Sequence, residues 1–262
     1  MCEIMYKDAT IYWHHFTFNS RMKVSVCIAT YNGEIYIRQQ LESILVQIGE
    51  NDEIIISDDG STDNTINIIK SLGDARIKIT YANGHNFKRN FENALCYATG
   101  DYIFLSDQDD VWVEGKFTTC LKELQTYDLV ITNSSVVDNN MHIIIPSFFD
   151  YYHSGPGVLK NSLNNTYFGA CMAFNRKILT FALPFPKTKE IGHDIWIGLV
   201  AEMVGKVHFI NQPFLLYRRH DLSLTNISTN LVTRSQRRLF TKLMSRCIVL
   251  YQVAVFYLKH KL

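Results

Sequence analysis

The stretch GDYIFLSDQDDVW, from Gly100 to Trp112, runs from an apolar, strand-like segment directly into three carboxylates. Asp107 and Asp109 are two residues apart, so on an extended chain their side chains point to the same side. Like charges this close raise each other's pKa unless a cation or a donor-rich loop neutralises them. Carboxylate oxygens suit a hard ion such as Mg²⁺ or Mn²⁺. The segment therefore predicts either a divalent metal site or a solvated acidic turn after a core strand, with Asp110 the carboxylate least expected to touch an ion.

Strand-like and helical segments alternate on both sides of this stretch. Short apolar runs rich in β-formers, each followed by a segment with helical spacing, occur at 23–30, 53–57, 77–81, 102–106 and 129–133. This alternation predicts an α/β fold with a mostly parallel central sheet flanked by helices. Ligands of such sheets bind beyond the carboxyl ends of the strands. Polar clusters follow the strands at Thr30-Tyr31-Asn32, Asp58-Asp59-Gly60-Ser61 and Asp107-Gln108-Asp109-Asp110, so we expect a binding site at that edge.

Length and composition limit the class of protein. The 262 residues suffice for one large domain with appendages, and a net charge of +1 argues against a general nucleic-acid binder. The six cysteines are scattered, without a C-x-x-C pair or a signal peptide, which favours a reduced, cytoplasmic setting. Cys27, Cys96 and Cys171 lie in apolar stretches and are predicted to be small core residues. No apolar run reaches the roughly 18–20 residues that span a bilayer.

The two ends of the chain differ from its centre. Residues 1–21 have neither strand alternation nor a helical period, so we expect a poorly ordered leader before a domain at 22–226. Residues 227–262 contain no acidic residue and form a basic tail with an apolar stripe at helical spacing: Phe240, Met244, Ile248, Tyr251, Val255 and Leu258. This pattern is typical of a helix lying on a membrane surface. A terminal helix packed on the domain or on a second copy explains it equally well.

Motifs along the chain, taken in order, resemble those of family 2 glycosyltransferases with the GT-A fold. They are VSVCIATYNGE, IIISDDGSTDNT, NFKRNFENAL…ATGDYIFLSDQDDVW, FGACMAFNR, GHDIW and YRRHD, and together they cover about residues 23–226. The NFENAL…GDYIFLSDQDD form is similar to bacterial rhamnosyltransferase-like members that act on cell-surface polysaccharides. The resemblance implies a GT-A domain, a nucleotide-sugar donor and inversion at the anomeric carbon, and the spacing of the tail adds a C-terminal helix. The Q-x-x-R-W motif of processive synthases is absent, so one sugar is expected per turnover.

The resemblance also implies which residues bind the nucleotide. Asp59 matches the carboxylate that accepts a hydrogen bond from the N3–H of uracil or thymine, with its neighbour Asp58 as the alternative. The other residues at nucleotide-binding positions are Thr30, Tyr31, Glu34, Lys88 and Arg89. For Lys88 and Arg89, which precede a predicted helix, solvated charges at the helix start are an equal alternative to phosphate binding.

Metal ligands follow from the same resemblance. Asp109 and Asp107 match the D-x-D pair that holds Mg²⁺ or Mn²⁺ on the donor diphosphate, and Asp109 is the first candidate for direct contact. His220, in an R-x-H pattern with Arg218, is a further candidate ligand of the metal or the diphosphate. A histidine satisfied at the end of a strand is the alternative for His220.

The candidate general base is Asp194, which matches the acidic residue of the family's E-D motif. Here His193 stands where the family has Glu, so His193 either shares the proton transfer or orients Asp194. Arg218, His193 and Gly169 are expected near the diphosphate or the acceptor.

The function expected is transfer of one sugar from a UDP- or dTDP-sugar, dTDP-rhamnose included, to a hydroxyl of a polysaccharide or lipid-linked acceptor. The enzyme would then work in the cytoplasm or peripherally at the inner face of the membrane, with acceptor choice in 134–167. An inactive nucleotide-sugar-binding protein is one alternative, disfavoured by the intact Asp107, Asp109 and Asp194. A sugar nucleotidyltransferase would need a basic, Gly-rich loop where TYNGE stands. A dehydrogenase would need G-x-G-x-x-G there.

Overall fold

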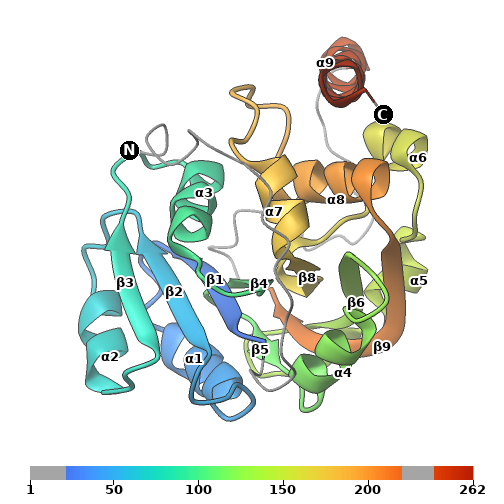
Figure 1. The fold of residues 1–262 in the computed structure, drawn as a ribbon. Coiled ribbons are helices and arrows are strands. Elements are labelled where there is room, and N and C mark those ends of the chain that lie inside the picture. Colours follow the sequence, from blue (N-terminus) through green and yellow to red (C-terminus); the bar gives the residue numbers. More distant parts are fainter. Residues whose placement is uncertain (1–21, 220–238, 262) are drawn as a thin grey trace, which may run out of the picture.

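The computed structural model describes residues 22–219 and 239–261 (Figure 1). The leader at 1–21 and His220 lie outside the described residues, and so does the segment that precedes the C-terminal helix. The strands are β1 (Val24–Thr30), β2 (Glu53–Asp58), β3 (Ile77–Tyr81), β4 (Tyr102–Asp107), β5 (Val111–Trp112), β6 (Leu129–Val137), β7 (Ile143–Ile145), β8 (Met172–Asn175) and β9 (Val207–Arg218). The α-helices are α1 (Ile37–Leu45), α2 (Thr65–Ser71), α3 (Phe87–Tyr97), α4 (Lys116–Glu123), α5 (Phe148–Tyr152), α6 (Val158–Leu163), α7 (Arg176–Ala182), α8 (His193–Val204) and α9 (Leu239–His260).

The first half of the sheet is parallel, as the alternation of strands and helices predicts. β1 lies between β2 and β4, and β3 pairs with the outer side of β2, all in parallel. In this register Thr30 pairs with Asp58 and Ala29 pairs with Asp107. The carboxyl ends of β1, β2 and β4 therefore meet at one edge, which brings the three polar clusters together.

The second half of the sheet departs from simple alternation. The order is β3-β2-β1-β4-β8-β6-β9-β5, and β8 is antiparallel to both of its neighbours. β9 is one long strand parallel to β6, although two separate apolar runs, 206–210 and 214–217, occur in its sequence. The register between β6 and β9 shifts beside Asn133. Figure 1 shows β9 bending around this end of the sheet, so that its last residues return toward β5.

The region at 134–167, expected to carry acceptor choice, contains more regular structure than its Gly and Pro content predicts. β6 continues to Val137, and β7, α5 and α6 follow. Ser147 caps α5 by accepting a hydrogen bond from the amide of Asp150. Phe148 and Phe149 are buried in the core, and this burial anchors the short helix.

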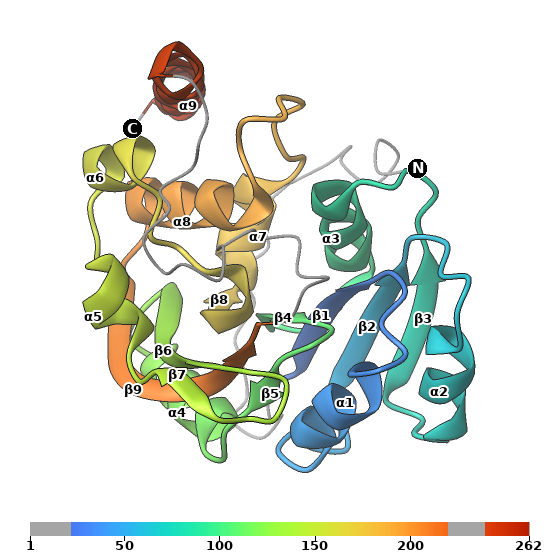
Figure 2. The same cartoon turned by 180° about the vertical axis from the view of Figure 1, so that it is seen from behind.

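The core lies between the sheet and the helices on both of its faces. Every residue of β1, β2 and β6 is buried. α3 covers β1 and β2 on the side of the sheet opposite α1 and α2 (Figures 1 and 2). Cys27 and Cys171 are buried as predicted, but the prediction for Cys96 was wrong, because this residue lies on the exposed side of α3.

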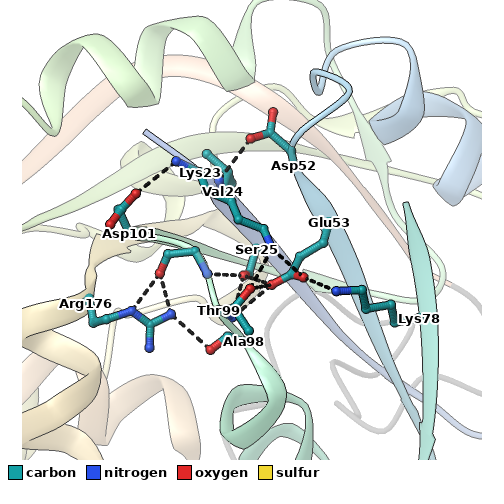
Figure 3. Close-up of polar contacts among 11 residues, drawn as sticks. Lys23, Val24, Ser25, Asp52, Glu53, Lys78, Ala98, Thr99, Asp101 and Arg176 are labelled. Atoms are coloured by element: carbon teal, nitrogen blue, oxygen red, sulfur yellow. Dashed lines mark hydrogen bonds and ion pairs between the residues drawn. The ribbon is translucent and has the colours of Figure 1, made fainter. Parts of the chain in front are cut away.

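At the amino ends of the strands, a polar network closes the edge of the sheet away from the three clusters (Figure 3). The carboxylate of Glu53 is 2% exposed and accepts from the ammonium groups of Lys23 (2.9 Å) and Lys78 (2.6 Å). Ser25 and Thr99 also donate to it. The network joins β1, β2 and β3 to the loop before β4, so it holds the parallel half of the sheet together.

Candidate active site

At the carboxyl edge, the end of β1 is tied to the end of β4 by one side chain. The amide group of Gln108 donates from Nε2 to the Tyr31 carbonyl oxygen (3.0 Å) and accepts at Oε1 from the Tyr31 N–H (2.9 Å). A Cβ at Gly33 would lie 2.4 Å from Gln108 Oε1, so glycine is needed there. The Tyr31 side chain stays 47% exposed, with its ring edge-to-face with His85. An exposed aromatic ring at this edge is available to a planar ligand.

The two adjacent aspartates after β2 have different surroundings. Asp58 is buried, and its carboxylate accepts from the hydroxyls of Thr30 and Ser61 and from the amides of Gly60 and Ser61. It shapes its own loop. Asp59 accepts three main-chain amides from residues 84–86, at 2.9, 3.1 and 2.8 Å. A carboxylate offers about four acceptor positions, which leaves Asp59 one for a ligand.

Three further nucleotide-site candidates have protein partners in the structure. Glu34 accepts a hydrogen bond from the amide of Asn64 at the start of α2. Lys88 donates from Nζ to the carbonyl oxygens of Pro186 and Thr188, in the loop before α8, and Arg89 forms an ion pair with Glu92. Lys88 therefore lies beside the loop that leads to the candidate base.

At Asp107, the last residue of β4, positive charge from the described residues only partly offsets burial and the neighbouring carboxylates. Oδ1 of Asp107 is buried and has no hydrogen-bond partner in the described part of the chain. Burial, together with the charges of Asp109 and Asp194, raises the pKa of Asp107 to about 8, against the lowering effect of Lys116. Asp107, Asp109 and Asp194 are thus close enough to interact electrostatically. A divalent cation would supply the missing charge, so these residues fit one.

Within 22–219 and 239–261, no group of three or more His, Cys, Asp or Glu side chains is arranged to hold a metal ion by itself. Mg²⁺ is commonly held by one or two carboxylates together with substrate phosphates and water. Asp107 and Asp109 match that pattern better than they match a closed protein cage. His220, the third candidate ligand, lies outside the described residues.

Hydrogen bonds between Asp110, Arg218 and the main chain fix the acidic turn at residues 107–110. Asp110 is fully buried, and its Oδ1 accepts from the main-chain N–H of Arg218 (3.0 Å). The Arg218 side chain is buried as well, and its Nε donates to the Asp109 carbonyl oxygen (2.9 Å). Its other donors reach Gln39 and the Asn139 carbonyl, and its guanidinium lies over the Tyr36 ring. In this structure Arg218 braces the turn rather than facing an open site.

Lys116 is a site residue that the sequence analysis missed. It is fully buried at the start of α4, where its Nζ donates to the Ala170 carbonyl oxygen (2.7 Å) and lies 4.5 Å from the centre of the Trp112 ring. Burial lowers its pKa, while the charges of Asp110 and Asp107 oppose that shift. A buried ammonium beside an acidic cluster is a fixed countercharge. Its only sequence signal is a lysine that follows the acidic turn by a few residues.

Asp194 lies in the first turn of α8, where the helix dipole favours a negative charge. Its Oδ1 accepts from the Ile195 amide (2.7 Å). Glycines leave room around the pair of residues at 193 and 194: a Cβ at Gly192 would lie 2.5 Å from Asp194 Oδ1, and one at Gly169 would lie 2.7 Å from His193 Nε2. His193, beside it, is buried and stacks on Phe91 with ring centres 4.1 Å apart. Burial lowers the pKa of His193, and Lys88 adds to this while Asp194 opposes it.

The structure thus gathers most of the candidates at the carboxyl edge of the sheet, with Asp107, Asp109 and Asp194 forming the acidic centre. Thr30, Asp58, Glu34, Arg89 and Arg218 instead direct their polar groups to protein partners. Gln108 and Lys116 join the site without having been predicted. The arrangement places Asp109 and Asp194 within electrostatic range of Asp107, beside the buried ammonium of Lys116.

Comparison with known proteins gives the family. Residues 25–181 match the model of glycosyl transferase family 2, and the chain belongs to that family. It is 29% identical over 212 residues to the Escherichia coli UDP-Glc:alpha-D-GlcNAc-diphosphoundecaprenol beta-1,3-glucosyltransferase WfgD, covering 79% of this chain and 80% of WfgD. It is 32% identical over 159 residues to the dTDP-rhamnosyl transferase RfbG of Shigella flexneri, across 50% of this chain and 51% of RfbG.

Solved structures agree on the fold. The crystal structure of residues 1–349 of TarS from S. aureus, in complex with UDP-GlcNAc, is similar with a TM-score of 0.64 at 19% identity. The alignment covers 77% of this chain and 60% of the TarS fragment, so the chain spans about three fifths of that fragment. The predicted GT-A fold and the predicted family, rhamnosyltransferase-like relatives included, are therefore confirmed.

Proposed function

We propose that this glycosyltransferase moves one sugar from a UDP- or dTDP-linked donor to a hydroxyl of a lipid-linked or polysaccharide acceptor, with inversion and with a divalent cation. The observation that carries the proposal is the acidic centre, in which Asp109 and Asp194 each lie close enough to Asp107 to raise the pKa of Asp107. Such a centre suits a cation-bound diphosphate next to a general base. WfgD and RfbG, whose names specify UDP-Glc and dTDP-rhamnosyl transfer, support the two donor classes.

Donor recognition is assigned to the ends of β1 and β2. The exposed ring of Tyr31 offers a stacking surface for the base. The acceptor position left on Asp59 suits the N3–H of uracil or thymine, which cytosine lacks. We assign Thr30, Asp58 and Glu34 to shaping this loop region.

Cation binding is assigned to Asp107 and Asp109. When bound, Mg²⁺ or Mn²⁺ neutralises the charge that grows on the departing diphosphate. The carboxylates of Asp107 and Asp109 would hold the cation, and the buried ammonium of Lys116 offsets part of the negative charge on Asp107.

Chemistry at the acceptor is assigned to Asp194. Its carboxylate takes the proton of the acceptor hydroxyl as that oxygen forms a bond to the anomeric carbon. The bond from the anomeric carbon to the diphosphate oxygen breaks on the opposite face, and the nucleotide leaves with the electron pair. No covalent enzyme intermediate forms. His193, neutral and stacked on Phe91, positions Asp194 rather than sharing the proton.

A donor screen tests the proposal. Metal-dependent hydrolysis and thermal stabilisation are measured with UDP-Glc, UDP-GlcNAc, dTDP-rhamnose, GDP-mannose and ADP-glucose. We expect uracil or thymine donors alone to stabilise the protein, and only when Mg²⁺ or Mn²⁺ is present. Asp109→Asn should remove the metal dependence. Equal stabilisation by GDP- and ADP-sugars, or stabilisation unaffected by EDTA, would contradict the assignment.

A further inference from the structure

Helix α9 is apolar on two opposite sides, and only one of them faces the domain. On the inner side Val249 and Phe256 are 4% and 5% exposed. The ring of Phe256 lies 5.6 Å from that of Trp196 in α8 and 6.4 Å from that of Phe181 in α7. The helix therefore packs on the domain, which is one of the two alternatives that the sequence left open. The residues that make this contact, Val249 and Phe256, do not belong to the apolar stripe identified in the sequence.

The opposite side of α9 carries four members of that stripe, Met244, Tyr251, Val255 and Leu258, into solvent. Exposed apolar side chains on it are Leu243 (58%), Met244 (46%), Tyr251 (64%), Val255 (41%) and Leu258 (75%). Their spacing of mostly three, four and seven residues puts them on one face of the helix, turned away from Val249 and Phe256. Soluble proteins rarely leave a continuous apolar face uncovered, and such faces mark interaction sites.

The neighbouring helix α6 extends this surface. α6 contacts α9, and Arg246 of α9 donates from Nε to the Leu163 carbonyl oxygen (2.9 Å). Leu159 and Leu163 of α6 are 70% and 49% exposed. Figures 1 and 2 show both helices at one outer end of the molecule. We call the exposed apolar side chains of these two helices the α6–α9 surface.

The two helices that form the α6–α9 surface carry charges of one sign only, although the carboxylate of Glu190, from the loop before α8, contacts α9 at Ser245. No acidic residue occurs after Asp221, and α9 and the residue after it carry Arg246, Lys259 and Lys261, while α6 carries Lys160. Two copies of this surface facing each other would bring like charges together. A bilayer with anionic headgroups offers both an apolar interior and the opposite charge. Within the described ranges, no helix is long and apolar enough to cross a membrane.

We propose that the α6–α9 surface docks this enzyme on an anionic lipid bilayer, with α9 lying in the plane of the interface. This deepens the proposed function, and rests on it, because a lipid-linked acceptor is presented at such a surface. The loop between α7 and α8 connects the α6–α9 surface to the candidate active site. The Ser245 hydroxyl of α9 donates to the Glu190 carboxylate in that loop, and Lys88 donates to its Pro186 and Thr188 carbonyls. The same loop leads into Asp194, so it joins the proposed lipid-binding helix to the candidate base.

Vesicle co-sedimentation of the full chain tests the proposal. We expect binding to phosphatidylcholine vesicles containing phosphatidylglycerol, and several-fold weaker binding to phosphatidylcholine alone. Leu258→Glu and Tyr251→Glu place a charge on exposed positions and should each lower partitioning about tenfold or more. Lys259→Gln should lower it about fivefold at low salt and less at high salt. Val46→Glu is the matched control, since Val46 is 82% exposed just after α1, at the other end of the molecule from α9, and should bind as the parent does.

Two outcomes overturn the proposal. One is equal binding of the parent chain to neutral and anionic vesicles, or no binding to either. The other is a dimer in light scattering that Leu258→Glu dissociates while vesicle binding stays absent, which would assign the surface to a second copy. Donor hydrolysis in solution separates the two proposals, because Leu258→Glu should leave it unchanged. If hydrolysis is absent from the parent chain but anionic vesicles bind it, the proposed function fails and the docking surface stands.

Discussion

The guanidinium of Arg218 donates from Nε to the main-chain carbonyl oxygen of Asp109 across 2.9 Å. The last strand of the domain thereby holds the turn that carries the candidate metal ligands, although the two residues are 109 positions apart in the chain. The main-chain N–H of Arg218 adds a second contact, to the Asp110 carboxylate. Arg218 is therefore a positioning residue for the acidic turn.

Arg218→Lys tests this relationship. A lysine cannot reach Asp109, Asn139 and Gln39 together, so contacts that the buried guanidinium makes are lost. We expect a loss of about 2–4 kcal/mol in the free energy of unfolding, measured by urea denaturation, and weaker Mn²⁺-dependent nucleotide binding. Arg38→Lys is the control, because Arg38 is 48% exposed in a surface ion pair and should cost less than about 1 kcal/mol. Unchanged Mn²⁺ dependence in Arg218→Lys would remove Arg218 from this role.

Lys116→Met tests the buried countercharge. Without the ammonium, Asp107 and Asp110 lose a nearby fixed cation, and removing one partner from a buried charge cluster typically costs about 3–5 kcal/mol. Thermal unfolding without metal should show a lower Tm than that of the parent chain. Because a divalent cation replaces the missing charge, Mn²⁺ should raise the Tm of the variant more than that of the parent. An equal metal-induced rise in both would show that Lys116 does not compensate the acidic cluster.

Gly169→Ala tests the room around the base. The added methyl group would lie 2.7 Å from His193 Nε2, so the His193 ring must move, and Asp194, whose Cβ would be 3.5 Å away, is displaced with its neighbour. Misplacing a catalytic group by about 1 Å can cost roughly 10²-fold in rate. We expect kcat to fall by about that factor while the donor Kd stays unchanged, as measured by steady-state kinetics and calorimetry. Gly84→Ala, where a Cβ meets nothing within 4 Å, is the control; a parallel loss of activity there would point to a general effect of added methyl groups.

Glu53 makes stability depend on pH. Burial alone would raise the pKa of its carboxyl, but hydrogen bonds from Lys78, Ser25, Thr99 and Lys23 hold the pKa well below the usual 4.5. A depressed folded-state pKa adds stability above the unfolded-state value, and that stability is lost as the pH falls through the folded-state value. The free energy of unfolding should therefore decline below about pH 4.5. Glu53→Gln should have a smaller free energy of unfolding at pH 7, and that free energy should fall less steeply as the pH is lowered. If both chains lost stability equally as the pH fell, Glu53 would be excluded as a source of the pH dependence.

Much of the fold follows from local pattern. The strands of the parallel half and their terminal polar clusters were predictable, because parallel strands with short crossovers bring their carboxyl ends to one edge. The antiparallel β8 was not, since its position depends on pairing with β4 and β6, which are distant in sequence.

Within the candidate site, long-range contacts set the limit of prediction. Asp107, Asp109 and Asp194 could be chosen from motif residues, but the contact of Gln108 with Tyr31 spans 77 positions. Lys116 looks like an ordinary helix-start lysine until its burial under the acidic turn is known. In α9 both faces are apolar, so periodicity alone did not reveal which face meets the domain.

The central claim is that Asp194 is the general base of a metal-dependent glycosyl transfer, and Asp194→Asn tests it most directly. With the donor found in the screen and a matching acceptor, turnover should fall by about 10²–10⁴-fold. Mn²⁺-dependent nucleotide binding, followed by calorimetry on the same preparation, should remain within a few-fold of the parent value. An Asp194→Asn variant that turns over at close to the parent rate would contradict the account.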